Sequence, residues 1–420
     1  MALNLSTLTS PATSGDVLAE ALTTADFLEP VPVLRNLARG SQKGGDAKQD
    51  VALNQPKALP LIDGDGYLYV SGVSGNNGIV PQALGMSNPW TIAIEAWVGD
   101  PVPLASSYTD YCILGSINSN ISIRMRYTGS FEVALGGFTD GVNAFRSMSA
   151  SALNLKALNT FNLSWDGTDT LTVIVNGTTV RTGTLSSPAS FGEFRLGERG
   201  GSTKESLLGY YKSLVVTESG SEIVNCDFTA TNVRHNDKKL KCATGQVVTI
   251  NQAGNDPATV IKKSVLRFDG TNSSLQGLFA NNINSGYMFA AFSVLGDGGE
   301  LYGRVLSVNS TGSLDYQTSG VIFSIRDGYT NHLGSFYNSA FNVENDLFDD
   351  NNGDILHEAR IKSGQNLSRV NGALPLADSR DTSSVNSDTF NISKTAFADG
   401  QAAIDLEYLA LFPSSITDAQ

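Results

Sequence analysis

The chain has 420 residues, which is too long for one hydrophobic core and long enough for two or three domains. Charged residues make up only 16% of the chain, which contains 42 glycines and 13 prolines; this composition predicts many short strands joined by tight turns rather than helices. The formal net charge of −13 argues against binding to nucleic acid or to anionic lipid.

The N-terminus has neither a basic start nor a long apolar run, so the sequence predicts no signal peptide. No stretch approaches the roughly 18 apolar residues that a membrane span needs, so no membrane insertion is expected. We therefore expect the protein to fold and assemble in the cytoplasm of the cell that makes it.

Three cysteines are an odd and low number, which predicts no disulfide framework. Cys112 lies in the run Tyr-Cys-Ile-Leu and is expected to be a small buried apolar residue. Cys226 and Cys242 flank a basic loop and could form a disulfide. The interpretation without a bond is favoured, because nothing else suggests an oxidising compartment.

Residues 1–58 are expected to form an N-terminal arm outside the sandwich domains. Between Ser14 and Leu28 the apolar residues have helical spacing, and a second short helix is expected around residues 33–38. The arm is locally basic, which predicts an anchor that docks on an acidic partner or on sister subunits; a mobile leader with solvated charges is the alternative. The residues assigned to the assembly role are Arg35, Arg39, Lys43 and Lys48.

From Leu59 onward the apolar period changes to two, as expected for half-buried strands. Apolar residues alternate through Trp90–Val98, through Phe161–Trp165 and again from Leu171 to Val175. The dipeptide Asn176-Gly177 then predicts a tight hairpin, because both of its residues tolerate a positive φ.

The same order of segments occurs twice, and this internal repeat predicts two similar domains. We expect a first sandwich at 59–218, a connecting segment at 219–262 that could add edge strands, and a second sandwich at 263–420. The matching segments are Asp63-Gly64 with Phe268-Asp269-Gly270, 112–116 with 304–308, 161–177 with 357–372, 194–197 with 390–393, and 211–216 with 406–412.

The repeated order resembles the concanavalin A-like superfamily, and laminin G-like domains in particular. The resemblance implies an all-β fold of two tandem jelly-roll β-sandwiches preceded by a short, partly helical arm. It depends on the order of the motifs and on their duplication, and the second copy departs from it by lacking the hairpin tryptophan. The motifs are the opening Phe268-Asp269-Gly270-Thr271-Asn272, the aromatic-rich strands Thr91–Val98 and Tyr287–Val294, and the hairpins that end in Val-Asn-Gly.

Paired domains of this kind behind a short anchoring arm resemble virion proteins of tailed bacteriophages. The resemblance implies a tail fibre, a tail-attached appendage or a head decoration. It further implies a homo-oligomer that binds other virion proteins through the arm and host-surface glycans through the sandwiches. A purely architectural head or tail protein without a ligand is an alternative.

The superfamily includes glucanases, so a glycoside hydrolase or depolymerase is a further alternative. A retaining mechanism needs two carboxylates about 5–5.5 Å apart. The nearest array is Asp405-Leu406-Glu407, but Ala403 occupies the position of a further carboxylate, so the array is incomplete. The histidines His235, His332 and His357 accompany no Gly-x-Ser-x-Gly motif. We assign no catalytic residue and expect a protein that is not an enzyme.

Many laminin G-like domains bind calcium through oxygen ligands on rim loops. Asp166 and Asp169, or Asp346, Asp349 and Asp350, could supply such ligands. Loops of this composition usually carry solvated turn aspartates, so we assign no metal site and no cofactor.

Sugar binding requires a flat aromatic side chain beside polar groups. Tyr108, Asp110 and Tyr111 are the candidates in the first repeat. Tyr329, Asn331 and His332 are the candidates in the second repeat. Each tyrosine could instead be an ordinary half-buried loop residue, which is the favoured interpretation.

Overall fold

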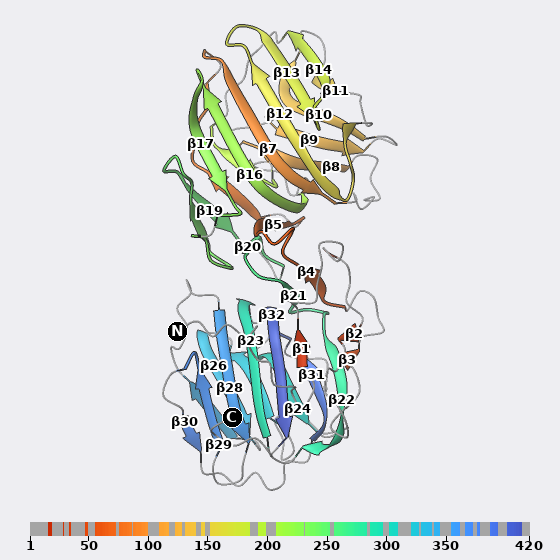
Figure 1. Cartoon of the computed structure of the whole chain (residues 1–420), viewed down its shortest axis with the longest axis vertical. Helices are drawn as coiled ribbons and strands as arrows, with labels where there is room; N and C mark the ends of the chain where they lie inside the picture. Colours follow the sequence, from red (N-terminus) through yellow and green to blue (C-terminus); the bar gives the residue numbers. More distant parts are fainter. Residues whose placement is uncertain are drawn as a thin grey trace. The chain divides into compact units, whose positions relative to one another are not determined.

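The computed structural model divides into two compact units of antiparallel strands (Figure 1). We call Ile62–Lys262 the first sandwich, and Met1–Leu61 together with Lys263–Gln420 the second sandwich. The described residues form thirty-two strands and no α-helix. They are 16–18, 28, 33–34, 47–48, 55–72, 75–85, 87–99, 109–116, 122–127, 131–139, 144–147, 152–184, 192–198, 207–230, 232–252, 256–283, 286–296, 302–309, 321–326, 329–337, 340–344, 354–361, 366–372, 376–378, 387–393 and 401–413.

The first sandwich consists of two eight-stranded sheets, the β7 sheet and the β8 sheet. In spatial order the β7 sheet contains β14 (Thr178–Thr184), β13 (Thr170–Val175), β12 (Ala157–Trp165), β7 (Trp90–Val98), β16 (Leu208–Glu218), β5 (Tyr67–Ser71) and β20 (Thr259–Ile261), with β17 (Ser221–Asp227) also paired to β16. The β8 sheet contains β11 (Ala144–Ser147), β10 (Phe131–Thr139), β9 (Ser122–Tyr127), β8 (Thr109–Gly115), β15 (Phe194–Leu196), β6 (Asn77–Val80), β19 (Val247–Asn251) and β18 (Lys239–Lys241).

The second sandwich likewise consists of two eight-stranded sheets, the β23 sheet and the β24 sheet. The β23 sheet contains β30 (Leu376–Asp378), β29 (Asn366–Val370), β28 (Asp354–Ile361), β23 (Gly286–Gly296), β32 (Ala403–Pro413), β21 (Val265–Asp269) and β4 (Lys57–Leu59), with β1 (Asp16–Leu18) also paired to β32. The β24 sheet contains β2 (Val33–Leu34), β3 (Ala47–Lys48), β22 (Leu275–Ile283), β31 (Ser387–Ile392), β24 (Tyr302–Asn309), β25 (Val321–Arg326), β26 (Tyr329–Tyr337) and β27 (Ala340–Glu344). The predicted fold class of two tandem all-β sandwiches is confirmed.

The two sandwiches have the same strand order, in which each strand of the chain corresponds to the strand numbered sixteen higher. The order β14-β13-β12-β7-β16-β5-β20 matches β30-β29-β28-β23-β32-β21-β4, and the order of the β8 sheet matches that of the β24 sheet in the same way. The strands β1–β4 therefore correspond to β17–β20. The repeat thus extends over 16–218 and 221–413 and includes the N-terminal segment.

This topology divides the chain differently from the sequence-based boundaries. The predicted connection at 219–262 contains β17–β20, which are integral strands of the first sandwich. The predicted arm at 1–58 contributes β1–β4 to the second sandwich, and in Figure 1 the red strand β1 lies beside the blue strand β32. Strand pairing between segments so distant in sequence leaves no local sequence signal, because it depends on the partner strand.

The strand alignment also tests the individual repeat matches. Phe161 corresponds to His357, because they pair with Ile94 and Ala290 at matching positions of β7 and β23. The match of Asp63-Gly64 with Asp269-Gly270 is wrong, because Asp269 ends β21, which corresponds to β5, whereas Asp63 precedes β5.

Two equivalent hairpins have the same local geometry in both repeats. Asn176 and Asn371 both have a φ of 50°, and each is followed by a glycine with a positive φ. The Asn176 side-chain oxygen accepts a hydrogen bond from the Thr160 N–H at 2.9 Å, and that of Asn371 accepts one from the Leu356 N–H at 2.8 Å. The predicted Asn-Gly turn is therefore confirmed at 176–177.

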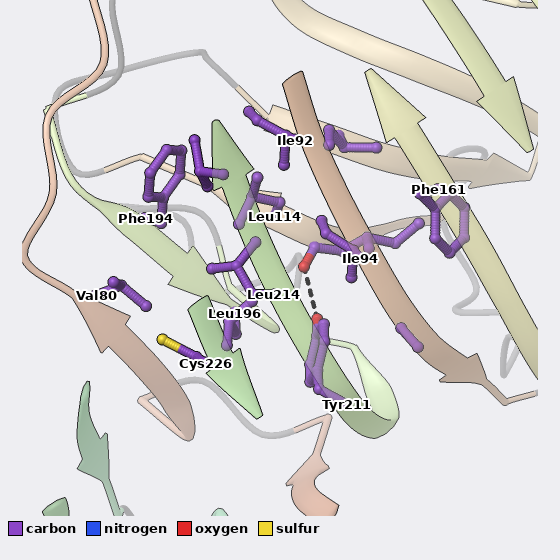
Figure 2. Close-up of a cluster of buried hydrophobic side chains, with 14 of the residues drawn as sticks. Val80, Ile92, Ile94, Leu114, Phe161, Phe194, Leu196, Tyr211, Leu214 and Cys226 are labelled. Carbon is purple, nitrogen blue, oxygen red and sulfur yellow. Dashed lines mark hydrogen bonds between the residues drawn. The ribbon is translucent and has the colours of Figure 1, made fainter. Parts of the chain in front are cut away.

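The core of the first sandwich follows from the alternation along its strands (Figure 2). Ile92, Ile94 and Phe161 point inward and are almost fully buried, and the opposite sheet supplies Leu114 and Leu196. These side chains lose most contact with water, which stabilises the unit by about 25 cal/mol per Å² of apolar surface buried.

A buried tyrosine joins the two sheets across this core. The Tyr211 hydroxyl donates a 2.6 Å hydrogen bond to the Ile113 carbonyl oxygen (Figure 2). Burial raises the pKa of Tyr211 well above its ordinary value, so the hydroxyl stays protonated and remains a donor.

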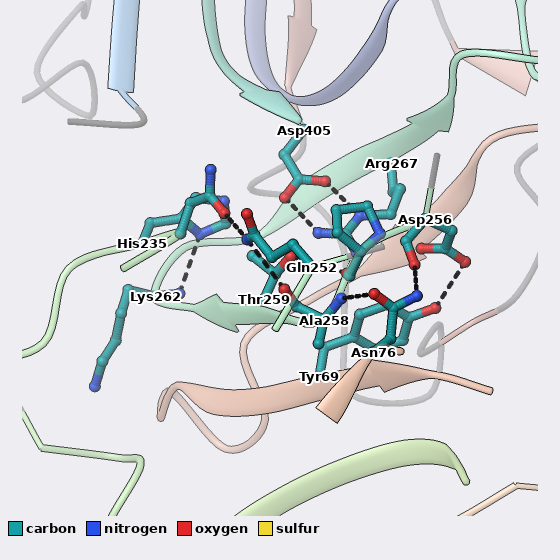
Figure 3. A network of polar contacts seen from close by, with 12 residues as sticks. Tyr69, Asn76, His235, Gln252, Asp256, Ala258, Thr259, Lys262, Arg267 and Asp405 are labelled. Carbon is teal, nitrogen blue, oxygen red and sulfur yellow. Dashed lines mark hydrogen bonds and ion pairs between the residues drawn. The ribbon is translucent and has the colours of Figure 1, made fainter. Parts of the chain in front are cut away.

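Polar groups are also buried, and they are paired (Figure 3). In the first sandwich the Tyr69 hydroxyl donates to Asp256 Oδ2 at 3.1 Å, and Asn76 Nδ2 donates to the Asp256 carbonyl oxygen at 3.0 Å. In the second, Arg267 Nε and Nη2 each donate to a different oxygen of Asp405 at 2.7 Å. The paired geometry offsets the cost of removing these charges from water.

The predicted helices in the N-terminal segment are wrong at the positions that the structure describes. Asp16–Leu18 is strand β1, paired with β32, and Val33–Leu34 is strand β2, paired with Lys48 and Ala47 of β3. Edge pairing satisfies backbone N–H and C=O groups that a short isolated helix would satisfy only marginally in water. Among the proposed assembly residues, Lys48 lies in β3 opposite Gln276; the others, Arg35, Arg39 and Lys43, lie outside the described residues.

The cysteines behave partly as expected. Cys112 is free and buried, as predicted. Cys226 and Cys242 form a disulfide between Cα atoms 4.4 Å apart, so the favoured interpretation of two free thiols is wrong. The fold brings the ends of β17 and β18 together, which their sequence separation of 16 did not require.

No helix suited to crossing a membrane occurs in the part of the chain that the structure describes.

Candidate functional site

The residues predicted to bind sugar in the first repeat are not on a loop. Asp110 and Tyr111 lie in strand β8, where they pair with Arg126 and Met125 of β9. Tyr108 lies outside the described residues. The backbone of Asp110 and Tyr111 is thus part of a sheet ladder.

The candidates in the second repeat are also strand residues. Tyr329, Asn331 and His332 lie in β26, which pairs with β25 and β27. By the strand order β26 corresponds to β10, whereas Asp110 and Tyr111 lie in β8. The two predicted sugar sites are therefore not equivalent positions of the repeat.

The aspartates considered for calcium serve their own turns where the structure describes them. Asp166 Oδ1 accepts hydrogen bonds from the N–H groups of Thr168, Asp169 and Thr170 at 2.8–3.0 Å. These bonds, that from Thr168 first, lower the pKa of Asp166 below its usual value. Within the described ranges no group of three or more His, Cys, Asp or Glu side chains is placed to hold a metal ion. Asp346, Asp349 and Asp350 lie outside these ranges.

The opening motif of the second repeat has a similar structural role. Asp269 Oδ1 accepts from the N–H groups of Thr271, Asn272 and Ser273, each at 2.9 Å. Burial acts to raise the pKa of Asp269, but the hydrogen bonds from these groups outweigh it and hold the pKa below its usual value.

The carboxylates nearest to a glucanase array are engaged in ion pairs. Asp405 is fully buried against Arg267. Glu407 Oε2 lies 2.6 Å from Lys263 Nζ. A general acid needs a raised pKa and a path to substrate, whereas Asp405 is held as a buried carboxylate by a guanidinium.

The outer face of the β23 sheet carries an accessible pair of aromatic rings. Met288 and Ala290 of β23 point into the core, so Tyr287 and Phe289 point to the opposite face, where both are half-buried. Their ring centroids are 6.3 Å apart, and the ring planes differ by 13°. Residues i and i+2 of a strand are about 6.7 Å apart, so the strand itself sets this spacing. We call these two residues the aromatic pair.

Polar side chains flank the aromatic pair on the neighbouring strand β28. Arg360 is the register partner of Tyr287, and Glu358 that of Phe289; both are half-buried. Glu358 also forms an ion pair with Arg369 of β29, whose Nε donates at 2.8 Å. The face therefore combines aromatic surface with fixed donors and acceptors, which is the chemistry that a sugar ring requires.

Apolar contacts support the aromatic pair from the other side. Phe289 packs against a small cluster formed by Ala291 and Tyr408, which also includes Leu356. Ala291 and Tyr408 are 7% and 8% exposed, so the ring of Phe289 has a nearly immobile neighbour. Such support lowers the side-chain entropy that is lost when a ligand binds.

The corresponding face of the first sandwich carries a different aromatic group. Trp97 is half-buried and stacks on Tyr210 with centroids 6.0 Å apart and an interplanar angle of 16°. Gly209 allows this close approach: a Cβ there would lie 2.1 Å from the Trp97 carbonyl oxygen. Trp97 corresponds to Ser293 of β23, so the outer faces of the two sandwiches differ in chemistry.

Sequence reasoning noted that Tyr287–Val294 is rich in aromatic residues but assigned the strand no binding role. The alternation Tyr-Met-Phe-Ala at 287–290 contained the signal, because it places the two rings on one face. The sequence alone could not show which face was covered, since both sets of side chains are apolar.

Comparison with known proteins gives only distant likenesses. No family model matches the chain, and no curated protein matches its sequence. Mouse laminin α1 chain domains LG4-5 are similar in structure with 10% identity, 82% of this chain and 88% of that chain covered, and a TM-score of 0.29. A Bacteroides ovatus protein named as a candidate carbohydrate binder has 16% identity, covers 50% of this chain and 62% of its own, and has a TM-score of 0.35. Trypanosoma rangeli sialidase has 10% identity, 71% and 58% coverage and a TM-score of 0.30.

Proposed function

We propose that this chain is a non-enzymatic surface-binding protein that binds carbohydrate through the aromatic pair of the second sandwich. The observation that carries the proposal is the outer face of β23, where Tyr287 and Phe289 lie beside Arg360 and the Glu358–Arg369 ion pair. Aromatic rings pack against the C–H face of a sugar, and charged side chains hydrogen-bond its hydroxyl groups. Rigid strands hold both kinds of group at fixed spacing.

We propose that the protein is displayed on a tailed-bacteriophage particle, as a tail fibre, an appendage or a head decoration. The support is the sequence resemblance and the tandem arrangement of two sandwiches, which offers several weak sites per chain. Linked weak sites raise avidity by about 10²–10⁴. Antibody labelling of purified particles tests this location: labelled particles are expected, and their absence from particles that contain all other virion proteins would contradict it.

An array of immobilised bacterial surface polysaccharides tests the binding site. The wild-type chain is expected to bind at least one polysaccharide, and Tyr287→Ala with Phe289→Ala to bind it about 10-fold more weakly, because each ring contributes about 0.5–1.5 kcal/mol. Leu278→Ala is the control, since Leu278 is a 55% exposed apolar residue of the β24 sheet in the same sandwich.

The array also separates the competing functions. Equal binding by the aromatic variant and the control would place the site elsewhere. No binding to any polysaccharide would favour a purely architectural protein. Release of reducing ends from a bound polysaccharide, lost in Asp405→Asn or Glu407→Gln, would show a hydrolase and sink the non-enzymatic proposal.

A further inference from the structure

The N-terminal segment completes a sandwich that is not its neighbour in the chain. Strands β1–β4 precede the first sandwich, yet they pair with β32, β22 and β21 of the second. The corresponding strands β17–β20 pair with the first sandwich, which they follow directly after the turn at Ser219-Gly220. The second sandwich thus receives from a distant segment what the first receives from its own continuation.

The contacts of this segment are those of an integral part of the fold. Ala58 is fully buried and belongs to the core of the second sandwich, opposite Leu266. The Ala58 carbonyl oxygen accepts from the Leu28 N–H at 2.9 Å, and the Leu61 N–H donates to Ser264 Oγ at 3.0 Å. Without the segment, Val265–Arg267 would lose β4 and leave backbone groups on a sheet edge unpaired, which invites pairing with another chain.

We infer that the segment 16–59 also completes the second sandwich of a second copy of this chain, so that two copies form a strand-exchanged dimer. The segment pairs with strands of its acceptor that lie about 200 or more residues further along the chain, and an identical segment of another copy can make the same pairings. Exchange of an identical element is a low-cost route to a dimer, because the exchanged segment makes the same contacts as before. Reciprocal exchange closes the assembly after two copies.

Charge favours a second copy as the partner. The stretch 33–57 contains five basic and two acidic residues, a local net charge of +3, in a chain whose net charge is −13. A basic segment is attracted to the acidic remainder of another copy, while the acidic surfaces of whole copies repel. The segment is therefore the part of this chain best suited to contact a second copy.

The native mass in solution is the first test. Light scattering coupled to size-exclusion chromatography of the full chain is expected to give twice the 44.4 kDa of one chain. A mass of 44.4 kDa at every protein concentration would overturn the inference.

A designed disulfide then identifies the exchanged contact. Lys48 pairs with the exposed Gln276, so Lys48→Cys with Gln276→Cys in one chain places two thiols opposite each other on β3 and β22. After oxidation a covalent dimer is expected on a non-reducing gel, because the thiol introduced on β3 of one copy faces the thiol introduced on β22 of the other. An intrachain bond in a protein of dimeric mass, or no bond at all, would overturn the inference, because the dimer would then use another surface.

The repeat supplies a matched control. Ile79 and Thr249 are the corresponding partners on β6 and β19 of the first sandwich. Their segment follows its own sandwich without exchange, so Ile79→Cys with Thr249→Cys is expected to give an intrachain bond and no covalent dimer. A covalent dimer in this control would show that the thiols react non-specifically between copies, and the interchain bond between β3 and β22 would then count against the exchange.

Discussion

Single residues at equivalent positions of the repeat carry different chemistry on the same backbone. Phe161 is a core residue of the first sandwich, and its counterpart His357 is fully buried in the second. His357 Nε2 lies 3.1 Å from Ser368 Oγ, and its register partners Ala290 and Val370 are apolar. Burial lowers the pKa of His357 to about 3, so the imidazole is neutral in the folded protein.

His357 is expected to make the second sandwich sensitive to acid. Its pKa is about 6.5 in the unfolded chain and about 3 in the folded one. Stability is therefore fully present above pH 6.5 and is lost as the pH falls from 6.5 toward 3, by at most about 1.4 kcal/mol per pH unit. His357→Phe is expected to flatten this dependence, measured by hydrogen exchange of β28 at pH 7 and pH 5. Ser368→Ala keeps the imidazole and should retain it; an unchanged slope in His357→Phe would contradict the assignment.

The buried Arg267–Asp405 pair replaces Tyr69 and Tyr210 of the first sandwich. Asp405→Ala would leave an unpaired buried guanidinium, so we expect a loss of about 3–5 kcal/mol in the free energy of unfolding. Arg267→Met combined with Asp405→Leu removes both charges and should cost much less. Urea denaturation measures both variants, and a double variant no more stable than Asp405→Ala would show that the pair contributes more than mutual neutralisation.

Among the strands, β17–β20 and β1–β4 perform the same task under different constraints. In the first sandwich the disulfide Cys226–Cys242 ties the end of β17 to the end of β18. The described strands β1–β4 contain no cysteine. The segment that follows its own sandwich is thus covalently fixed, whereas the segment that pairs at a distance is held by backbone pairing and core contacts.

Removal of this disulfide is expected to destabilise the first sandwich alone. Closing a loop of this length contributes about 3 kcal/mol in the chain-entropy model. Cys226→Ala with Cys242→Ala should lower the stability of the first sandwich by about this amount and leave hydrogen exchange in β23 and β28 unchanged. Cys112→Ala, which removes the free thiol, serves as the cysteine control. Faster exchange in the second sandwich would contradict the separation of the two units.

For the protein as a whole, the repeat makes each unit depend on a segment that can be changed independently. Ala58 and Val260 occupy the same position in β4 and β20, and both are fully buried. Ala58 belongs to the core of the second sandwich and Val260 to that of the first. A change near the N-terminus therefore acts on a unit that lies mostly beyond residue 262.

Matched substitutions test this dependence. Ala58→Asp is expected to unfold or loosen the second sandwich and spare the first, while Val260→Asp should do the reverse, because an uncompensated buried carboxylate costs several kcal/mol. Peptide-resolved hydrogen exchange distinguishes the two units. If Ala58→Asp affected β5–β16 instead, the N-terminal segment would belong to the first sandwich.

Much of the fold could be predicted from the sequence. Alternation of apolar residues identified the strand at Trp90–Val98 and its neighbours, and Asn176-Gly177 specified a hairpin, because both signals are local. The duplication was visible from Phe161–Gly177 and His357–Gly372 for the same reason. The candidate sugar sites at Tyr108 and Tyr329 rested on composition, which does not show whether a residue lies in a loop or a strand.

The strand class, the repeat and the hairpins were thus already specified by the order of amino acids, since each depends on neighbouring residues. Three features became evident only from the folded chain: β1–β4 complete the second sandwich, Cys226 meets Cys242, and Tyr287 and Phe289 lie on an accessible face. These features depend on which distant strand becomes a neighbour. Backbone pairing uses the same N–H and C=O groups at every residue, so the local sequence carries little information about its partner.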